Sequence, residues 1–377
     1  MKAGWSTATL GDTCEMYQPK TITGKEMTED GAYSVFGANG IIGKYDKYNH
    51  EEPQLLVTCR GATCGSVNIS EPKSWITGNA MVIRPKDARI DFRFLEYYFR
   101  GGLDISVAIT GAAQPQITRT NLEPLEISYP NSIKEQQRIV TLLDEAFAHI
   151  ATAKANAGQN LQNARALFDS HLQSVFTQGG DGWKLKTLDE ISSTFGRGKS
   201  KHRPRNEPKL YGSKYPFIQT GDIRNAGHYI TEYSQTYSEL GLAQSKLWPK
   251  GTICITIAAN IAETAILDFD ACFPDSVIGV VPDPSQAEIG FVEYLLQSFK
   301  VRIQSLGKGS AQANINMGTF ENEHFPFPPI AAQKQIVEKL DALSTETHRL
   351  ESIYQQKLSA LEALKKSLLH QAFSGQL

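Results

Sequence analysis

One segment occurs twice in this chain, and the distance between its copies constrains the fold more than any other feature. Residues 139–144 read IVTLLD and residues 336–341 read IVEKLD, 197 positions apart. Further pairs of segments repeat in the same order: residues 5–13 with 183–191, 94–99 with 291–296, 111–117 with 309–315, and 164–176 with 361–373. A period of roughly 20–50 residues would predict a solenoid, whereas a period near 200 predicts two domain-sized copies.

Each copy has two parts of different composition. The first part contains short β-like runs, such as QLLVTCRG and GTICITIA, broken by turn signals such as GANG and PDPS. In the second part Gly and Pro nearly vanish and Ala, Leu, Gln, Lys and Glu dominate, which favours one long helix. The predicted fold is α+β, with two α/β domains separated by two long helices in a pseudo-twofold internal repeat. Its parts are residues 1–131 for the first domain, 132–178 for the first helix, 181–329 for the second domain and 330–377 for the second helix.

Both long segments carry apolar residues in the heptad pattern of a coiled coil. The predicted seam consists of Ile139, Leu143, Ile150 and Leu167 in the first helix, and Ile336, Leu340, Leu343, Leu350, Leu361 and Leu364 in the second. A helix of about 43 residues spans roughly 65 Å, so its apolar stripe needs a partner, which the other copy can supply. Antiparallel pairing would place the domains at opposite ends of the helices, and parallel pairing would place both at one end. The alternative, that each is a core helix of its own domain, is disfavoured because ordinary helices run about 8–20 residues.

No segment predicts a catalytic residue, a cofactor or a metal site. FGRGKS (residues 195–200) ends like a phosphate-binding loop, but that motif requires Gly where this chain has Ser193. FPFPPI has Phe327 where an amino-methyltransferase needs Asn or Asp before Pro-Pro. The five cysteines form no CxxC pair, and no apolar run reaches the ~18 residues of a membrane span. We therefore expect a cytoplasmic chain that is not an enzyme by itself.

The most informative binding signal is a run of cations within residues 195–209. They alternate with small or turn residues, and no acid occurs between Glu190 and Glu207. The cations are Arg197, Lys199, Lys201, Arg203 and Arg205. Such a loop can neutralise several phosphates of double-stranded DNA and would make affinity depend on salt. The net charge of −2 gives no global basic field, so DNA binding needs a local patch of this kind. The alternative interpretation is a solvated surface loop.

Other predicted loops carry side chains of the types that contact base edges. Arg suits guanine, and Asn and Gln suit adenine. In the first copy the candidates are Asn39, Arg60, Thr63, Gln114 and Gln116; in the second they are Gln219, Arg224, Asn260, Gln312 and Asn314. Each could instead be a turn or capping residue. Their interest lies in their presence at matching turn positions of both copies.

Taken together, these features resemble the DNA-specificity (S) subunit of type I restriction–modification systems. The resemblance covers essentially the full chain and lies in the order and duplication of several motifs. These are YSVFGANGIIG (residues 33–43), YPFIQTGDI (215–223), GAAQPQI with GSAQANI, the two helix starts, and the terminal LLHQAFSGQL (368–377).

The resemblance implies two target-recognition domains held by an antiparallel coiled coil. Each domain would recognise one half of a split, asymmetric DNA site, and the coiled coil would set the unread gap. The helices would dock two methyltransferase subunits, which carry S-adenosylmethionine, so no cofactor is expected in this chain. A translocase–nuclease (restriction) subunit can join such complexes. Two other functions stay open: a self-contained DNA methyltransferase, and a coiled-coil scaffold that binds only protein.

Overall fold

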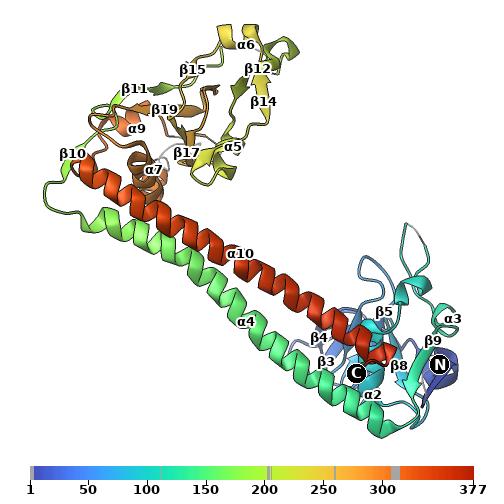
Figure 1. The fold of residues 1–377 in the computed structure, drawn as a ribbon. Helices are drawn as coiled ribbons and strands as arrows, with labels where there is room; N and C mark the ends of the chain where they lie inside the picture. Colours follow the sequence, from blue (N-terminus) through green and yellow to red (C-terminus); the bar gives the residue numbers. More distant parts are fainter. Residues whose placement is uncertain (1–3, 112, 202–203, 205, 259, 307–314) are drawn as a thin grey trace. The chain divides into compact units, whose positions relative to one another are not determined.

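The computed structural model describes residues 4–111, 113–201, 204, 206–258, 260–306 and 315–377. The chain divides into two compact units, one formed by residues 1–159 with 355–377 and the other by residues 160–354. Each unit contains one α/β domain and one end of both long helices, α4 (Ile133–Gln178) and α10 (Ile330–Ser374) (Figure 1). The fold predicted from the duplication, two α/β domains with two long helices, is confirmed.

The domain of the first unit is built on sheets with strand orders β2-β8-β5-β6 and β4-β3-β7, together with the pair β1-β9. The strands are β1 (Trp5–Thr9), β2 (Cys14–Tyr17), β3 (Tyr33–Gly37), β4 (Gly40–Tyr45), β5 (Leu55–Thr58), β6 (Val67–Ile69), β7 (Trp75–Ile76), β8 (Ala80–Pro85) and β9 (Glu126–Pro130). The short helices are α1 (Leu10–Thr13), α2 (Phe92–Gly101), the 3₁₀ turn η1 (Ile105–Ala108) and α3 (Arg119–Leu122). All four residues of β5 are buried, because this apolar run is covered on both faces.

The domain of the second unit repeats this plan with additions. Its sheets have the orders β11-β19-β16-β17-β13 and β14-β12-β18-β15, with the pair β10-β20. The strands are β10 (Lys184–Lys186), β11 (Ser192–Arg197), β12 (Tyr211–Phe217), β13 (Tyr229–Ile230), β14 (Gln235–Tyr237), β15 (Leu247–Trp248), β16 (Ile253–Thr256), β17 (Thr264–Leu267), β18 (Ala271–Cys272), β19 (Val277–Pro282) and β20 (Phe325–Phe327). The helices are α5 (Thr220–Asn225), α6 (Glu239–Ala243), α7 (Ile289–Ser298), α8 (Lys300–Leu306) and α9 (Met317–Glu321), with the 3₁₀ turn η2 (Pro208–Leu210). The order β11-β19-β16-β17 corresponds to β2-β8-β5-β6, and β16 is buried along its length as β5 is.

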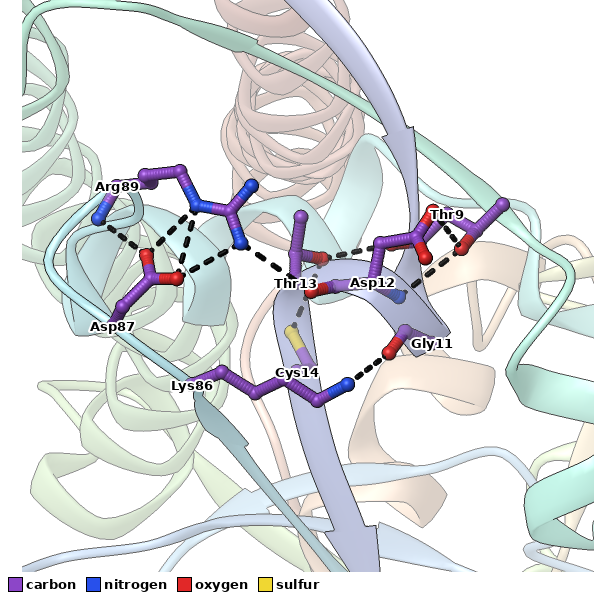
Figure 2. Close-up of polar contacts among 8 residues, drawn as sticks. All are labelled: Thr9, Gly11, Asp12, Thr13, Cys14, Lys86, Asp87 and Arg89. Carbon is purple, nitrogen blue, oxygen red and sulfur yellow. Dashed lines mark hydrogen bonds and ion pairs between the residues drawn. The ribbon is translucent and has the colours of Figure 1, made fainter.

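Polar contacts attach α1 to the loop that follows β8 in the first unit (Figure 2). The Lys86 ammonium donates to the carbonyl oxygen of Gly11, and the Arg89 guanidinium donates to the carbonyl oxygen of Asp12 at 3.4 Å. Arg89 also forms an ion pair with Asp87 at 2.8 Å. These contacts give the last carbonyls of a one-turn helix cationic partners, which such helix ends favour.

A buried glutamine near the start of each long helix repeats in the structure as it does in the sequence. Gln136 accepts a hydrogen bond from the Asp91 N–H at 2.8 Å and donates to the carbonyls of Arg89 at 2.9 Å and Pro130 at 2.8 Å. Gln333 is its counterpart, with one accepted and two donated hydrogen bonds to the matching segments of the second domain. Each glutamine therefore joins its long helix to the start of α2 or α7.

A tyrosine–aspartate hydrogen bond repeats in the same way. The Tyr97 hydroxyl of α2 donates to the Asp144 carboxylate of α4, and the Tyr294 hydroxyl of α7 donates to the Asp341 carboxylate of α10 at 2.7 Å. The repeated FLEYYF/FVEYLL and IVTLLD/IVEKLD segments thus meet each other within each unit. This contact explains why these segments occur together in both copies.

The two long helices pair antiparallel in each unit. In the first unit Lys154 of α4 forms an ion pair with Glu362 near the end of α10. In the second unit Arg165, late in α4, pairs with Glu351 at 3.1 Å. From Lys154 to Arg165 the pairing moves forward along α4 and backward along α10, and Figure 1 shows the two helices running side by side. The antiparallel coiled coil is confirmed, and the parallel arrangement is wrong.

Most predicted seam residues are buried or half-buried, but two are exposed. Ile139, Leu143, Ile150 and Leu340 are buried, whereas Ile336, Leu343, Leu350 and Leu361 are half-buried. Leu167 is 52% exposed and Leu364 is 46% exposed, so their assignment to the seam is wrong. A straight helix drifts by about 20° per heptad relative to a strict 3.5-residue repeat. Leu167 lies four heptads after Ile139, so at its position a strict heptad count no longer points to the interface. On α4, Ala157 and Ala164 are buried, and Leu172 is buried in the core of the second domain.

Candidate nucleic-acid interface

Two loops of the first domain that are distant in the sequence lie side by side. Arg60, just after β5, forms an isolated antiparallel bridge with Gln116. The N–H of Gly61 donates to the carbonyl of Pro115 at 3.1 Å, and the N–H of Ile117 donates to the carbonyl of Cys59 at 2.9 Å. The predicted base-contacting segments CRGATCG and GAAQPQI therefore lie together. Asn39 joins them through a hydrogen bond from Thr58 at the end of β5. We call Asn39, Arg60, Thr63, Gln114 and Gln116 the first loop cluster.

A cavity of about 330 Å³ opens beside the first loop cluster. Its lining includes Tyr17, Gln18, Met16, Met81, Arg60, Gln116, Ile117, Thr118 and Arg119. The guanidinium of Arg60 is exposed and makes no ion pair or hydrogen bond with any residue that the structure describes. Arg119, by contrast, is bound to Glu123 at 2.6 Å. An unpaired guanidinium beside an exposed glutamine amide can engage base-edge acceptors and donors.

The other members of the first loop cluster differ in whether their side chains form hydrogen bonds within the protein. The Asn39 side-chain oxygen accepts a hydrogen bond from the Thr58 hydroxyl at 3.1 Å. This oxygen therefore ties the turn between β3 and β4 to the end of β5. Thr63 and Gln114 are exposed. Gly111 has a φ of +85°, and a Cβ there would lie 2.6 Å from the Gln114 carbonyl oxygen. Only glycine fits this turn, which presents Gln114 at the surface.

In the second domain the start of the cationic run is fixed against the turn before β19. The Arg197 guanidinium donates to the carbonyl of Asp275 at 2.8 Å. A Cβ at Gly198 would lie 2.3 Å from the Pro274 carbonyl oxygen, so this position requires glycine. Lys199 and Lys201 are exposed beyond this anchor. We call Arg197, Lys199 and Lys201 the cationic loop; Arg203 and Arg205, predicted with them, lie outside the described residues.

Sequence reasoning missed one cation that belongs with the cationic loop. The Ser245 hydroxyl donates to the Lys199 carbonyl at 2.8 Å, which brings the neighbouring Lys246 close to Lys199. Burial and, next, the charge of Lys199 lower the pKa of Lys246. The Lys246 ammonium lies 3.5 Å from the centre of the Trp248 ring. The sequence signal for this contact is that Lys246 and Trp248 are two residues apart. In an extended segment, side chains two residues apart lie on the same face.

The predicted base-contacting residues of the second domain do not form a single cluster in the described part of the chain. Gln219 is occupied locally, since its N–H donates to Asp222 at 2.8 Å and its side-chain amide donates to Gln235 at 2.5 Å. Arg224 is exposed, with a contact of 3.4 Å to the Asn225 side chain. Gln219 therefore fits the alternative interpretation, a turn or capping residue, better than Arg224 does.

The remaining candidates of the second domain lie near the end of β16. The carbonyl of Asn260 accepts a hydrogen bond from the Thr256 hydroxyl, which closes the loop after this strand. The N–H of Ile315 donates to the carbonyl of Ile257 at 3.3 Å, as Ile117 does to Cys59 in the first domain. Gln312 and Asn314 lie outside the described residues. The backbone frame of the first loop cluster is therefore repeated in the second domain.

Among the described residues, no three His, Cys, Asp or Glu side chains lie close enough together to hold a metal ion. Burial raises the pKa of the Cys59 and Cys254 thiols, which keeps both protonated. In the part of the chain that the structure describes, no helix is long and apolar enough to cross a membrane.

Comparisons with known proteins point to one family. The family model described as "Type I restriction modification DNA specificity domain" matches residues 2–160 and 180–360, one match in each copy. A putative type I restriction enzyme specificity subunit (MjaX) from Methanocaldococcus jannaschii is 23% identical over 317 residues, which cover 79% of this chain and 71% of that protein. The EcoKI specificity subunit of Escherichia coli K12 is 24% identical over 206 residues, covering 52% of this chain and 44% of that protein.

Two solved structures share the fold. A chain from a structural study of complex assembly and conformational transition in a type I R-M system superposes with a TM-score of 0.81 at 17% identity, covering 100% of this chain and 99% of that one. The HsdS subunit from Thermoanaerobacter tengcongensis gives a TM-score of 0.67 at 17% identity, covering 100% and 98%. At this identity the likeness shows a common architecture.

Proposed function

Because the chain belongs to the type I restriction modification DNA specificity family, we propose that it is the non-catalytic, sequence-recognising subunit of such a complex. The resemblance inferred from the sequence motifs is confirmed by the family match in both copies. The observation that carries the proposal is that two equivalent frameworks present unlike loop surfaces. The first presents Arg60 beside Gln116, and the second presents the cationic loop.

Each recognition domain would contact one half of a split DNA site. In the first domain, the unpaired Arg60 guanidinium and the exposed Gln116 amide suit direct contacts to purine edges. In the second, Lys199 and Lys201 suit phosphates, which position a protein on the duplex without specifying sequence. Since the two surfaces differ, the two half-sites should differ in sequence. The paired helices α4 and α10 would fix the unread gap between them.

The long helices also offer a surface for partners. Leu142, Leu167, Ile353 and Leu364 are exposed on α4 and α10 although they are large and apolar. Large exposed apolar residues contribute to a protein–protein contact surface where they gather into a patch. Leu167 and Leu364 occupy equivalent positions of the 197-residue repeat, so a partner that binds one can bind the other. This supports docking of two methyltransferase subunits, which would carry S-adenosylmethionine, with a restriction subunit able to join them.

Binding of the chain with its methyltransferase partner to a duplex library tests the proposal. We expect retention of duplexes that share a split sequence, with affinity that falls as salt rises. Retention without any sequence preference, or binding that is insensitive to salt, would leave the protein-only scaffold as the better function. Methyl transfer to DNA by the isolated chain, measured with labelled S-adenosylmethionine, would instead support the self-contained methyltransferase.

A further inference from the structure

Two lysines of the second domain lie close together without an opposite charge. Lys199 follows β11, and Lys246 lies between α6 and β15; the Ser245 hydroxyl bonded to the Lys199 carbonyl at 2.8 Å joins the two segments. Among the described residues, neither ammonium group forms an ion pair. Other lysines of this domain do have carboxylate partners, as Lys250 has Asp268 at 2.7 Å.

The position of Lys246 is fixed by the ring beneath it. Its ammonium lies 3.5 Å from the centre of the Trp248 ring, a geometry in which cation and ring attract each other. Trp248 is 1% exposed and stacks on Phe273, with ring centres 5.0 Å apart. A Cβ at Gly279 would lie 2.7 Å from the Trp248 ring, so glycine there allows the ring to sit flat against β19. The Lys246 ammonium is therefore held over a buried ring, on the segment that Ser245 joins to the backbone of Lys199.

Two nearby cations on a rigid support repel each other unless an anion joins them. Burial is the larger cause of the lowered pKa of Lys246, and repulsion by the Lys199 charge lowers the pKa further. An oxyanion placed between the two ammonium groups would remove it and would accept a hydrogen bond from each. The Lys246 ammonium is already held over the Trp248 ring, so it loses less conformational entropy when such an anion binds.

We propose that Lys246 and Lys199 together hold one phosphodiester group of the DNA backbone, with Trp248 as the platform. This inference rests on the proposed DNA-recognition function and assigns a phosphate site to its second domain. The site positions the duplex and does not distinguish bases, because it contacts only the backbone.

The test measures the dissociation constant of the chain with its methyltransferase partner for a cognate and a scrambled duplex over a range of salt concentrations. Lys246→Gln should weaken binding to both duplexes by the same factor, roughly tenfold. Lys250→Gln is the matched control, since Lys250 already has a carboxylate partner, and it should bind like the wild type. Lys246→Arg should restore most of the affinity, because the charge remains. Unchanged binding by Lys246→Gln, or loss of preference at a single base pair, would overturn the proposal.

The double variant Lys199→Gln with Lys246→Gln tests whether the phosphate is shared. One neutralised phosphate contributes about 0.9 to the slope of log affinity against log salt concentration. The double variant should therefore lower that slope by about one, and a drop of about two would show separate phosphates and refute a shared site. If the wild type itself shows no preferred duplex, the proposed function fails. If the wild type has a preference and these variants change nothing, the phosphate site alone fails.

Discussion

Replacing Gln136 by Leu should destabilise the first unit far more than the same change one residue later. The substitution keeps the side-chain size and removes a fully buried amide that forms three hydrogen bonds, at 2.8, 2.9 and 2.8 Å. The Asp91 N–H and the carbonyls of Arg89 and Pro130 would lose a partner. A typical intramolecular hydrogen bond contributes about 1 kcal/mol net, so the expected loss is about 3 kcal/mol.

Gln137→Leu is the matched control, since Gln137 is exposed on the same helix. Calorimetry of the full chain should show a first-unit transition lowered by roughly 6–12 °C in Gln136→Leu, from about 2–4 °C per kcal/mol for a unit of this size. Gln333→Leu should lower the second-unit transition in the same way. Equal shifts for Gln136→Leu and Gln137→Leu would refute the claim that the buried amide joins helix and domain.

Three further predictions concern the coiled coil, the framework and the first loop cluster. Leu340→Ala should lower the free energy of unfolding, measured in urea, by about 2–5 kcal/mol. Leu364→Ala, at an exposed position, should change it by no more than about 0.5 kcal/mol. Equal losses for the two variants would show that Leu364 does belong to the seam. Burial and the hydrogen bond to Asp144 raise the pKa of Tyr97 to about 12, so the unfolded chain loses this proton first and stability falls as pH rises above about 10. Tyr97→Phe should make that alkaline loss less steep in unfolding experiments, and an unchanged slope would contradict it. Arg60→Gln should cost about 1–3 kcal/mol of discrimination at one base pair with the salt slope unchanged; a uniform loss over all sequences would make Arg60 a phosphate contact.

The helices were predicted well because the heptad pattern and the composition of each long segment are local in sequence, and the repeat shows the same pattern twice. The start of α10 is Ile330, where the prediction placed it, and α4 begins at Ile133 after a predicted start at 132. Of the predicted seam residues, Leu143 is buried and Leu167 is exposed, because a strict heptad ignores the drift of a 3.6-residue helix. The limits given for the two recognition domains stay predictions.

The candidate interface could be predicted only in part, because its surfaces depend on which loops meet. Arg60 and Gln116 were each suggested by residue type, but their bridge arises from the sheet topology. Lys246 was missed because it joins Lys199 through Ser245, a contact between segments 46 residues apart in the chain. The role in DNA contact of every candidate residue stays a prediction.

The most direct test of the central claim is selection from a library of random duplexes by the chain together with its methyltransferase partner, followed by sequencing. Bipartite recognition predicts two short defined sequences, unlike each other and separated by an undefined gap of constant length. The Arg60→Gln variant should change one of the two sequences and leave the other intact. A single contiguous motif, a gap of variable length, or no enriched sequence would contradict the account.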